Sequence, residues 1–227
     1  MNMISVIIPI YNEETTIKQL LRFLESIKNQ CEIIFVDGGS TDRTLELIGE
    51  RFTVYTSEKG RANQMNAGAE LSTGDVLFFL HCDSELPATM IEEIEHVMKQ
   101  YRAGCFGIAF HSWNFFMFTC RVISNHRAKY RKIVFGDQGI FIERKLFFEV
   151  GMFPKLPILE DYQFSLALKE RGIKLGMTKH RIYTSDRRFQ GGTIGKLKIM
   201  WKMNRIRAMY RKGVSIDEIA KMYLDVR

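Results

Sequence analysis

Five consecutive residues, His81 to Glu85, place an imidazole, a thiol, a hydroxyl and two carboxylates directly after a short apolar run. The carboxylates of Asp83 and Glu85 are hard oxygen donors, of the kind that hold Mg²⁺ or Mn²⁺ beside a phosphate. The same residues would also suit a solvated turn before a helix, with Asp83 or Ser84 as its N-cap. Both interpretations stay open for this stretch taken alone.

Two further polar clusters also allow both a functional and a purely structural interpretation. Asp37 is followed by two glycines and a serine, where its carboxylate could bind a ligand or close an Asx turn on its own loop. The two glycines would let the backbone approach a ligand closely. Glu160 and Asp161 open a predicted helix, so they could supply a general base or only interact favourably with the helix dipole.

Four apolar runs predict the strands that carry these clusters. The strand-like runs cover residues 3–10, 32–36, 52–56 and 76–80. Helical spacing of apolar residues follows each strand, at residues 15–28, 44–51, 62–71 and 88–101. This alternation predicts βαβ units, and hence an α/β fold with a mostly parallel, Rossmann-like sheet flanked by helices on both faces. Because the carboxyl ends of parallel strands share one edge, we expect the polar loops to form one site there.

The second half of the chain is less regular. Strand-like runs cover residues 105–110, 134–142, 173–177 and 181–184, and helical runs cover 144–150, 160–171 and 194–212, with a last short helix from 215. Trp113 to Ile123 is apolar and aromatic, and Arg121 to Lys132 is basic, which suggests an amphipathic helix pair. That stretch could bind a membrane surface, or pack into the core with a solvated basic side.

Composition and charge exclude several classes of protein. The 227-residue chain is 46% hydrophobic, without an apolar run long enough for a transmembrane helix, and we expect no signal peptide. Four cysteines without a CxxC pair argue against a zinc site or disulfides and indicate a reducing, cytoplasmic setting, which allows contact with the inner membrane face. The net charge of +7 favours anionic partners, whereas no nucleic-acid-binding motif is present.

Four blocks, taken together, resemble a family-2 inverting glycosyltransferase with the GT-A fold. They are Val6–Glu13, Val36–Asp42, Leu80–Asp83 and Leu159–Asp161. His81 stands where the family's Asp-x-Asp metal motif has its first Asp. The Phe-Leu-His-x-Asp and Gly-Asp-Gln-Gly signatures further resemble a small soluble subgroup, part of which is associated with arsenosugar biosynthesis. The resemblance spans about residues 3–190, and the C-terminal helices match less well.

The resemblance implies a nucleotide-sugar donor site at the predicted sheet edge. The residues that it places at the nucleotide are Pro9, Tyr11, Glu13, Asp37, Gly39, Arg61, Asn66 and His81, with Arg187 and Arg188 at the diphosphate. Asp83 would hold Mg²⁺ or Mn²⁺, which stabilises the charge on the departing diphosphate. His81 could bind the nucleoside sugar or ligate the metal weakly, and a packed histidine is the alternative.

The resemblance also implies the acid–base chemistry. Asp161, with Glu160 beside it, matches the base that deprotonates the acceptor, and a single inverting displacement needs only one such base. Asp137 and Gln138 are expected beside the acceptor or the donor sugar. The implied division of the single domain, residues 1–227, is a nucleotide-binding half (1–101), an acceptor-side half (102–190) and a C-terminal helical extension (191–227). The reaction would move a sugar, from a UDP-sugar in our prediction, to an unidentified small molecule, lipid or glycan.

Three alternatives are weighed against this prediction. A catalytically silent nucleotide-sugar-binding protein or membrane-docked partner is favoured by the histidine at position 81. A sugar nucleotidyltransferase should have a Gly-rich, basic loop after its first strand, where this chain has the acidic run Tyr11–Glu14. A Rossmann hydride-transfer enzyme is disfavoured, since no Gly-x-Gly-x-x-Gly follows that strand.

Overall fold

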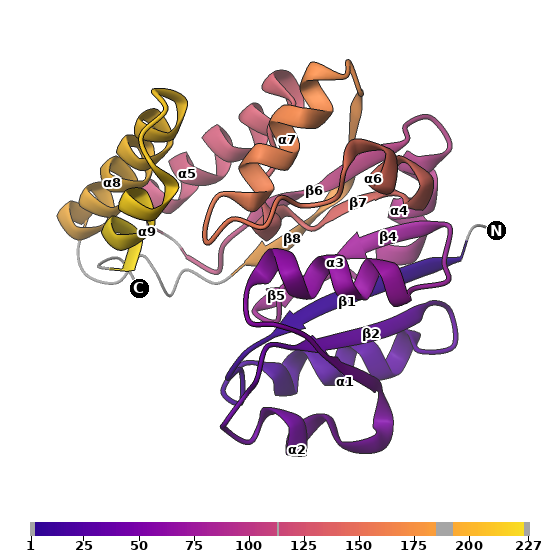
Figure 1. Ribbon diagram of the computed structural model, residues 1–227. Coiled ribbons are helices and arrows are strands. Elements are labelled where there is room, and N and C mark those ends of the chain that lie inside the picture. Colours follow the sequence, from indigo (N-terminus) through magenta and orange to yellow (C-terminus); the bar gives the residue numbers. More distant parts are fainter. Residues whose placement is uncertain (1–2, 113, 185–192, 225–227) are drawn as a thin grey trace.

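The computed structural model describes residues 3–112, 114–184 and 193–224, which form one eight-stranded sheet covered by helices (Figure 1). The strands are β1 (Ile4–Ile10), β2 (Glu32–Asp37), β3 (Thr53–Thr56), β4 (Val76–Phe79), β5 (Ser84–Glu85), β6 (Ala103–Ala109), β7 (Ile140–Glu143) and β8 (Leu175–Thr184). The α-helices are α1 (Ile17–Ile27), α2 (Thr44–Ile48), α3 (Arg61–Leu71), α4 (Met90–Met98), α5 (Phe115–His126), α6 (Arg144–Val150), α7 (Glu160–Glu170), α8 (Thr193–Arg211) and α9 (Ile216–Leu224). Short turns of 3₁₀ helix, η1 (Gly49–Arg51) and η3 (Gly136–Gln138), and of π-helix, η2 (Arg127–Arg131), complete the fold.

The sheet is buried on both faces, as its continuous apolar strands require. On one face, α1, α2 and α4 pack on alternate residues of β1 such as Val6 and Ile8. On the other face, α3, α6 and α7 pack on residues such as Ile7 and Leu77. Figure 1 shows α3 crossing one face of the sheet and α1 and α2 lying on the opposite side. The predicted fold class, an α/β sheet flanked by helices, is confirmed.

The strand order is β3-β2-β1-β4-β7-β6-β8-β5. β3, β2, β1 and β4 are mutually parallel, whereas β7 is antiparallel to both β4 and β6, and β5 is antiparallel to β8. The predicted mostly parallel sheet is therefore observed, although the sequence pattern did not indicate which strands are antiparallel. The start of β7 pairs with the end of β4, through Ile140 and Phe79. The turn η3 therefore lies at the same edge as the loop after β4.

Three segments differ from the sequence-based prediction in more than their end residues. The two late strands form one continuous strand, β8. The expected helix pair is, in its described part, one helix, α5, which is capped by Asn114 and continues into η2. Residues 134–139 are not a strand, because η3 and the left-handed Gly139 (φ 58°) turn the chain before β7 begins.

The C-terminal helices pack directly onto the domain. Ile206 of α8 and Ile219 of α9 are buried with Leu159 and Tyr162, at the start of α7. Figure 1 shows both helices at one end of the molecule, beside α5 and α7. No helix in the described part of the chain is long and apolar enough to cross a bilayer.

Candidate functional site

The loops after β1 and β2 are joined to each other by hydrogen bonds. Asn12 adopts a left-handed φ of 53°, and its Oδ1 accepts from the backbone N of Thr41 at 2.8 Å. Its own backbone N donates to Ser40 Oγ at 3.0 Å, and that of Glu13 donates to Thr44 Oγ1 at 2.7 Å. The two loops therefore form one unit at the carboxyl edge of the sheet.

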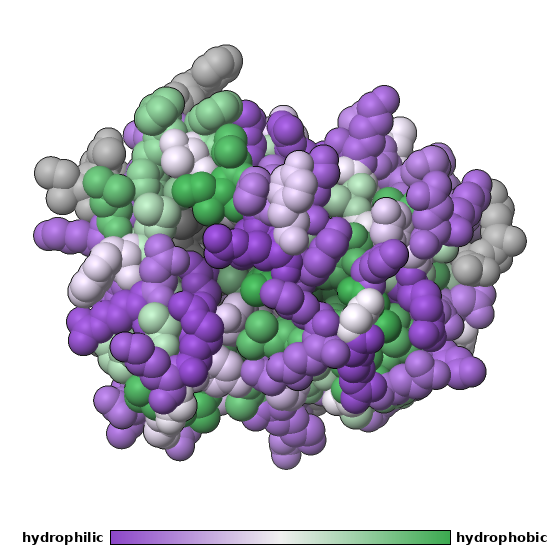
Figure 2. Space-filling view, turned by 90° about the horizontal axis from the view of Figure 1, so that it is seen from above, coloured by the Kyte–Doolittle hydropathy of each residue, from purple (hydrophilic) through white to green (hydrophobic). Residues whose placement is uncertain are grey.

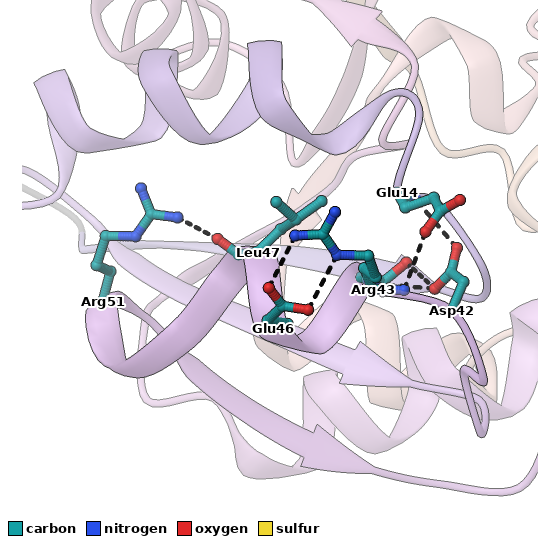
Figure 3. A network of polar contacts seen from close by, with 7 residues as sticks. Glu14, Asp42, Arg43, Glu46, Leu47 and Arg51 are labelled. Carbon is teal, nitrogen blue, oxygen red and sulfur yellow. Dashed lines mark hydrogen bonds and ion pairs between the residues drawn. The ribbon is translucent and has the colours of Figure 1, made fainter.

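A second set of contacts extends this unit into α2 (Figure 3). The backbone N of Glu14 donates to Asp42 Oδ2, and that of Arg43 donates to Glu14 Oε2, both at 3.1 Å. The guanidinium of Arg43 binds both carboxylate oxygens of Glu46, at 3.0 and 2.9 Å. Exposed ion pairs contribute little to stability. We therefore infer that these contacts mainly order the loop between β2 and α2.

Asp37 closes its own loop. Its carboxylate accepts from the backbone N of Gly39 at 2.9 Å and from the N and Oγ of Ser40, and the residue is only 3% exposed. The Asx turn, one of the two interpretations of this cluster, is therefore present. Gly39 has a φ of +90°, and a Cβ there would meet nothing within 4 Å, so the backbone borders open space. Contact of either residue with a nucleotide stays a prediction.

Gln64 is a residue of the site that the sequence did not reveal. It is buried on α3, and its Nε2 donates to the carbonyls of Ile10, at 2.6 Å, and Val36, at 2.8 Å. These carbonyls belong to the last residue of β1 and the penultimate residue of β2, so one amide holds both strand ends in place. A Cβ on Gly38 would lie 3.1 Å from this amide, which explains the first glycine of the pair. No sequence pattern signals such a contact.

The residues predicted for the nucleoside pocket after β1 lie at this edge. Tyr11 is 37% exposed, and Lys59 Nζ lies 3.8 Å from the centre of its ring. This cation–π contact connects the loop after β1 with the loop after β3. Glu13 accepts a hydrogen bond from Thr16 through its carboxylate, and Pro9 is half-buried within β1. Tyr11 is thus the most exposed of the three.

Asn66 and Arg61 have partners other than the expected nucleotide. Asn66 is buried, and its side chain donates to Phe153 O at 2.8 Å and accepts from Phe153 N at 3.1 Å. These two contacts hold the amide against the backbone of Phe153, and contact of Asn66 with a nucleotide stays a prediction. Arg61 reaches the buried Glu160, with 3.1 Å between Nε and Oε1. Burial opposes the charge of Arg61, but the carboxylates of Glu160 and Asp161 outweigh it and raise its pKa.

His81, Gly136 and Asp161 meet at the end of β4. The backbone N of Gly136 donates to Asp161 Oδ2 at 2.7 Å, and the other carboxylate oxygen accepts from Tyr162 N at 2.6 Å. A Cβ on Gly136 would lie 2.7 Å from His81 Nε2 and 3.5 Å from Asp161 Oδ2. One methyl group would therefore fill the space between the imidazole and the carboxylate. Two motifs that lie far apart in the sequence are in this way brought into contact.

Asp83 borders a cavity of about 610 Å³ between the start of α1 and the ends of β5 and β8. Glu85, also in its lining, pairs with His111 at 2.8 Å, and His111 stacks on Tyr183 with ring centres 4.3 Å apart. Within the described ranges, no three His, Cys, Asp or Glu residues are grouped as a metal would require. One carboxylate does fit a Mg²⁺ or Mn²⁺ ion whose other ligands are diphosphate oxygens and water.

Asp137 and Gln138 form the turn η3 but differ in exposure. Gln138 is fully buried, accepts from Arg127 Nη2 at 3.0 Å and donates to Phe106 O at 3.5 Å. These contacts hold the turn in place, and contact of Gln138 with the acceptor or the donor sugar stays a prediction. Asp137 is half-buried and remains a candidate for contact with the substrate.

Arginines from η2 and α8 surround this turn. Arg127 and Arg207 lie 3.9 and 5.1 Å from the centre of the Phe135 ring, and Arg211 Nη1 donates to Tyr162 Oη at 3.2 Å. Burial lowers the pKa of Arg127, and the charge of Arg207 adds to this effect. Burial likewise lowers the pKa of Arg207, where Arg211 is the neighbouring cation. The carboxylates of Asp137 and Asp161 act in the opposite direction on both arginines. The surroundings of Asp161 are therefore positively charged. Arg187, Arg188 and Trp113 lie outside the described residues.

Comparison with known proteins identifies the family. Residues 5–156 match the family described as "Glycosyl transferase family 2". The chain belongs to glycosyl transferase family 2. The match includes the loops after β1, β2 and β4 and the turn η3, and it ends before Glu160. The expected glycosyltransferase is thus confirmed at the level of the family, and the assignment of a base on α7 stays a prediction.

Three proteins illustrate the similarity of the chain to other glycosyltransferases. An undecaprenyl-phosphate 4-deoxy-4-formamido-L-arabinose transferase from Pseudomonas paraeruginosa is 34% identical over 116 residues, which are 45% of this chain and 33% of that protein. A mannosyltransferase from Pyrobaculum calidifontis, solved with GDP-Man and Mn²⁺, has a TM-score of 0.69 at 15% identity and covers 99% of this chain and 70% of its own. Glucosyl-3-phosphoglycerate synthase from Mycobacterium tuberculosis was solved with Mn²⁺, UDP-Glc and phosphoglyceric acid. It has a TM-score of 0.64 at 15% identity, and the alignment covers 94% of this chain and 81% of the synthase.

These similarities have different weight. The two solved structures share the fold, which confirms the expected GT-A architecture. The alignment with the curated relative spans about a third of that relative's length. Its substrates are therefore no guide to the substrates of this family 2 member, which have to be argued from the site.

Proposed function

We propose that this protein transfers a sugar from a nucleotide-sugar donor to an acceptor hydroxyl, with inversion at the anomeric carbon. The observation that carries this proposal is the contact between His81, Gly136 and Asp161. In this proposal the contact brings the Asp161 carboxylate to the loop after β4, which also contains Asp83 on the expected diphosphate side of the site. A one-step displacement needs a base and a leaving-group site facing a common space.

Asp161 acts as the base in this proposal. It takes the proton of the acceptor hydroxyl while the acceptor oxygen bonds to the anomeric carbon and the diphosphate leaves from the opposite face. The backbone N–H groups of Gly136 and Tyr162 fix the orientation of the carboxylate. Glu160 contributes by position, because its pairing with Arg61 ties the first turn of α7 to α3.

The loops after β1 and β2 would hold the nucleotide, with Tyr11 as the exposed aromatic. Asp83 would hold a divalent cation, and that ion would supply positive charge to the leaving diphosphate. The solved mannosyltransferase and synthase contain Mn²⁺ with a nucleotide sugar, which supports this assignment. UDP as the nucleotide, the cytoplasmic location and the arsenosugar-associated subgroup stay predictions.

A catalytically silent nucleotide-sugar-binding protein is the second candidate. One observation favours it: the family's Asp-x-Asp motif has a histidine at position 81. Such a protein would bind the nucleotide sugar without breaking the bond to the sugar.

Binding of nucleoside diphosphates, measured by calorimetry with and without Mn²⁺, tests the donor site. We expect UDP to bind only with Mn²⁺, and Asp83→Ala to lose this binding. Asp75→Ala is the matched control, because Asp75 is exposed and precedes the same strand at the opposite edge. If no nucleoside diphosphate binds under either condition, the donor-site assignment is wrong.

Hydrolysis of the donor, with water as the acceptor, tests the base. Asp161→Asn should lower the rate by about 10²–10⁴-fold while the dissociation constant of the donor is unchanged. Asp217→Asn, on the exposed start of α9, should have no effect. Tight donor binding without turnover in the unmodified protein would favour the silent candidate.

A further inference from the structure

Helices α5 and α8 expose a set of large apolar side chains. On α5 these include Phe115, which is 82% exposed, and on α8 they include Trp201, which is 62% exposed. The full set, called here the α5–α8 patch, comprises Phe115, Phe118, Val122, Ile123, Leu197 and Trp201. Each of its members is at least 46% exposed, so the patch is not part of the core. The sequence left open whether the aromatic stretch that forms α5 packs into the core. Only the inner side of α5 does so.

The two helices lie against each other through their inner sides. Phe116, Met117 and Cys120 of α5 are buried together, and Met200 of α8 packs against them. Cys120 Sγ lies 3.9 Å from Met200 Sδ. This contact leaves the outer sides of both helices facing solvent together. Figure 2 shows apolar side chains gathered on the surface at the end of the molecule that carries α5 and α8.

The charged residues on the elements that carry the patch have one sign. Neither α5, η2 nor α8 contains an aspartate or glutamate, whereas each contains lysine or arginine. Arg121 Cζ lies 4.7 Å from the centre of the Phe118 ring, and Arg205 Cζ lies 5.5 Å from that of Trp201. Each of these guanidinium groups therefore lies over an aromatic ring of the patch, in cation–π contact.

We propose that the α5–α8 patch docks the protein onto the surface of an anionic lipid bilayer. Exposed apolar side chains with a rim of cations match the apolar and anionic layers of such a surface. No helix in the described ranges could span the bilayer, so the contact is peripheral. A second copy of the chain fits less well, because a symmetric pairing of two patches would bring cationic rims together. The proposal goes beyond sugar transfer and does not depend on it.

Co-sedimentation with lipid vesicles tests the proposal. The unmodified protein should sediment with vesicles of phosphatidylcholine mixed with phosphatidylglycerol, and not with phosphatidylcholine alone. Phe115→Ser combined with Phe118→Ser should lower the partition coefficient by about tenfold or more. Lys198→Glu combined with Arg205→Glu should lower it similarly at low salt, because anionic lipid attracts each cation.

Leu45→Ser combined with Leu71→Ser is the matched control. These leucines are 42% and 45% exposed on α2 and α3, away from the patch, and should not affect sedimentation. Equal binding by the Phe115/Phe118 variant, equal binding to neutral vesicles, or no binding by the unmodified protein would overturn the proposal. A dimer in light scattering that the same variant makes monomeric would instead assign the patch to contact between copies.

Discussion

Gly136→Ala is the substitution that most directly tests the geometry of the site. The new Cβ would lie 2.7 Å from His81 Nε2 and 2.8 Å from Cε1. Ordinary contacts begin at 3.4 Å, so the imidazole or the turn must move by about 0.7 Å. Gly136 N is also the donor to Asp161, and therefore movement of the turn displaces the base. A misplacement near 1 Å costs up to about 10²-fold in rate, so we expect a loss of roughly 10–10²-fold.

The assay is donor hydrolysis at saturating nucleotide sugar, together with thermal unfolding. Overpacking should also lower the free energy of unfolding by about 1–3 kcal/mol. Gly107→Ala is the matched control, because its Cβ would come no closer than 3.4 Å to any neighbour. His81→Ala in the Gly136→Ala background removes the imidazole and should restore the lost stability. A Gly136→Ala protein with unchanged rate and stability would refute the reasoning.

Two further predictions concern Gln64, which contacts the site, and Glu32, which lies at the opposite edge of the sheet. Gln64→Met keeps the side-chain volume but removes the amide from two strand-end carbonyls, and chemical denaturation should show a loss of about 1–3 kcal/mol. An unchanged denaturation midpoint would show that these two hydrogen bonds from Gln64 do not stabilise the fold. Burial opposes the charge of Glu32, but hydrogen bonds from Ser5 and Thr73 outweigh it and lower its pKa below the usual 4.5. Its contribution to stability is therefore complete above about pH 4.5 and lost as pH falls through the folded-state pKa. Glu32→Gln should weaken the fall of Tm with acidification, and parallel curves for the two proteins would count against this.

Much of the first half of the fold could be predicted from local pattern. The runs that become β1, β2 and β4 are continuously apolar because helices cover both faces of those strands. The polar loops at their ends share an edge because the strands are parallel. These rules need only neighbouring residues and the direction of each strand, and they located Tyr11 and Asp37 at that edge.

Residues whose partners are distant could not be predicted in this way. Gln64 and Asn66 both lie on α3, and only the folded chain shows what each of them binds. Asn66 pairs with the backbone of Phe153, 87 residues further along. A backbone carbonyl has no residue-specific signature, so nothing in the sequence marks it as the partner of an amide. The same reason hides the pairing of β5 with β8.

The direction of β7 decides whether the two halves of the site meet. β7 runs antiparallel to β4, with Ile140 opposite Phe79, so its preceding turn lies beside His81. If β7 were parallel, that turn would begin at the opposite edge, about 10–13 Å away for a strand of four residues. Gly136 could not then donate to Asp161 and border the imidazole at once. The assignment of Asp161 as the base therefore rests on a strand reversal, which no local sequence pattern reveals.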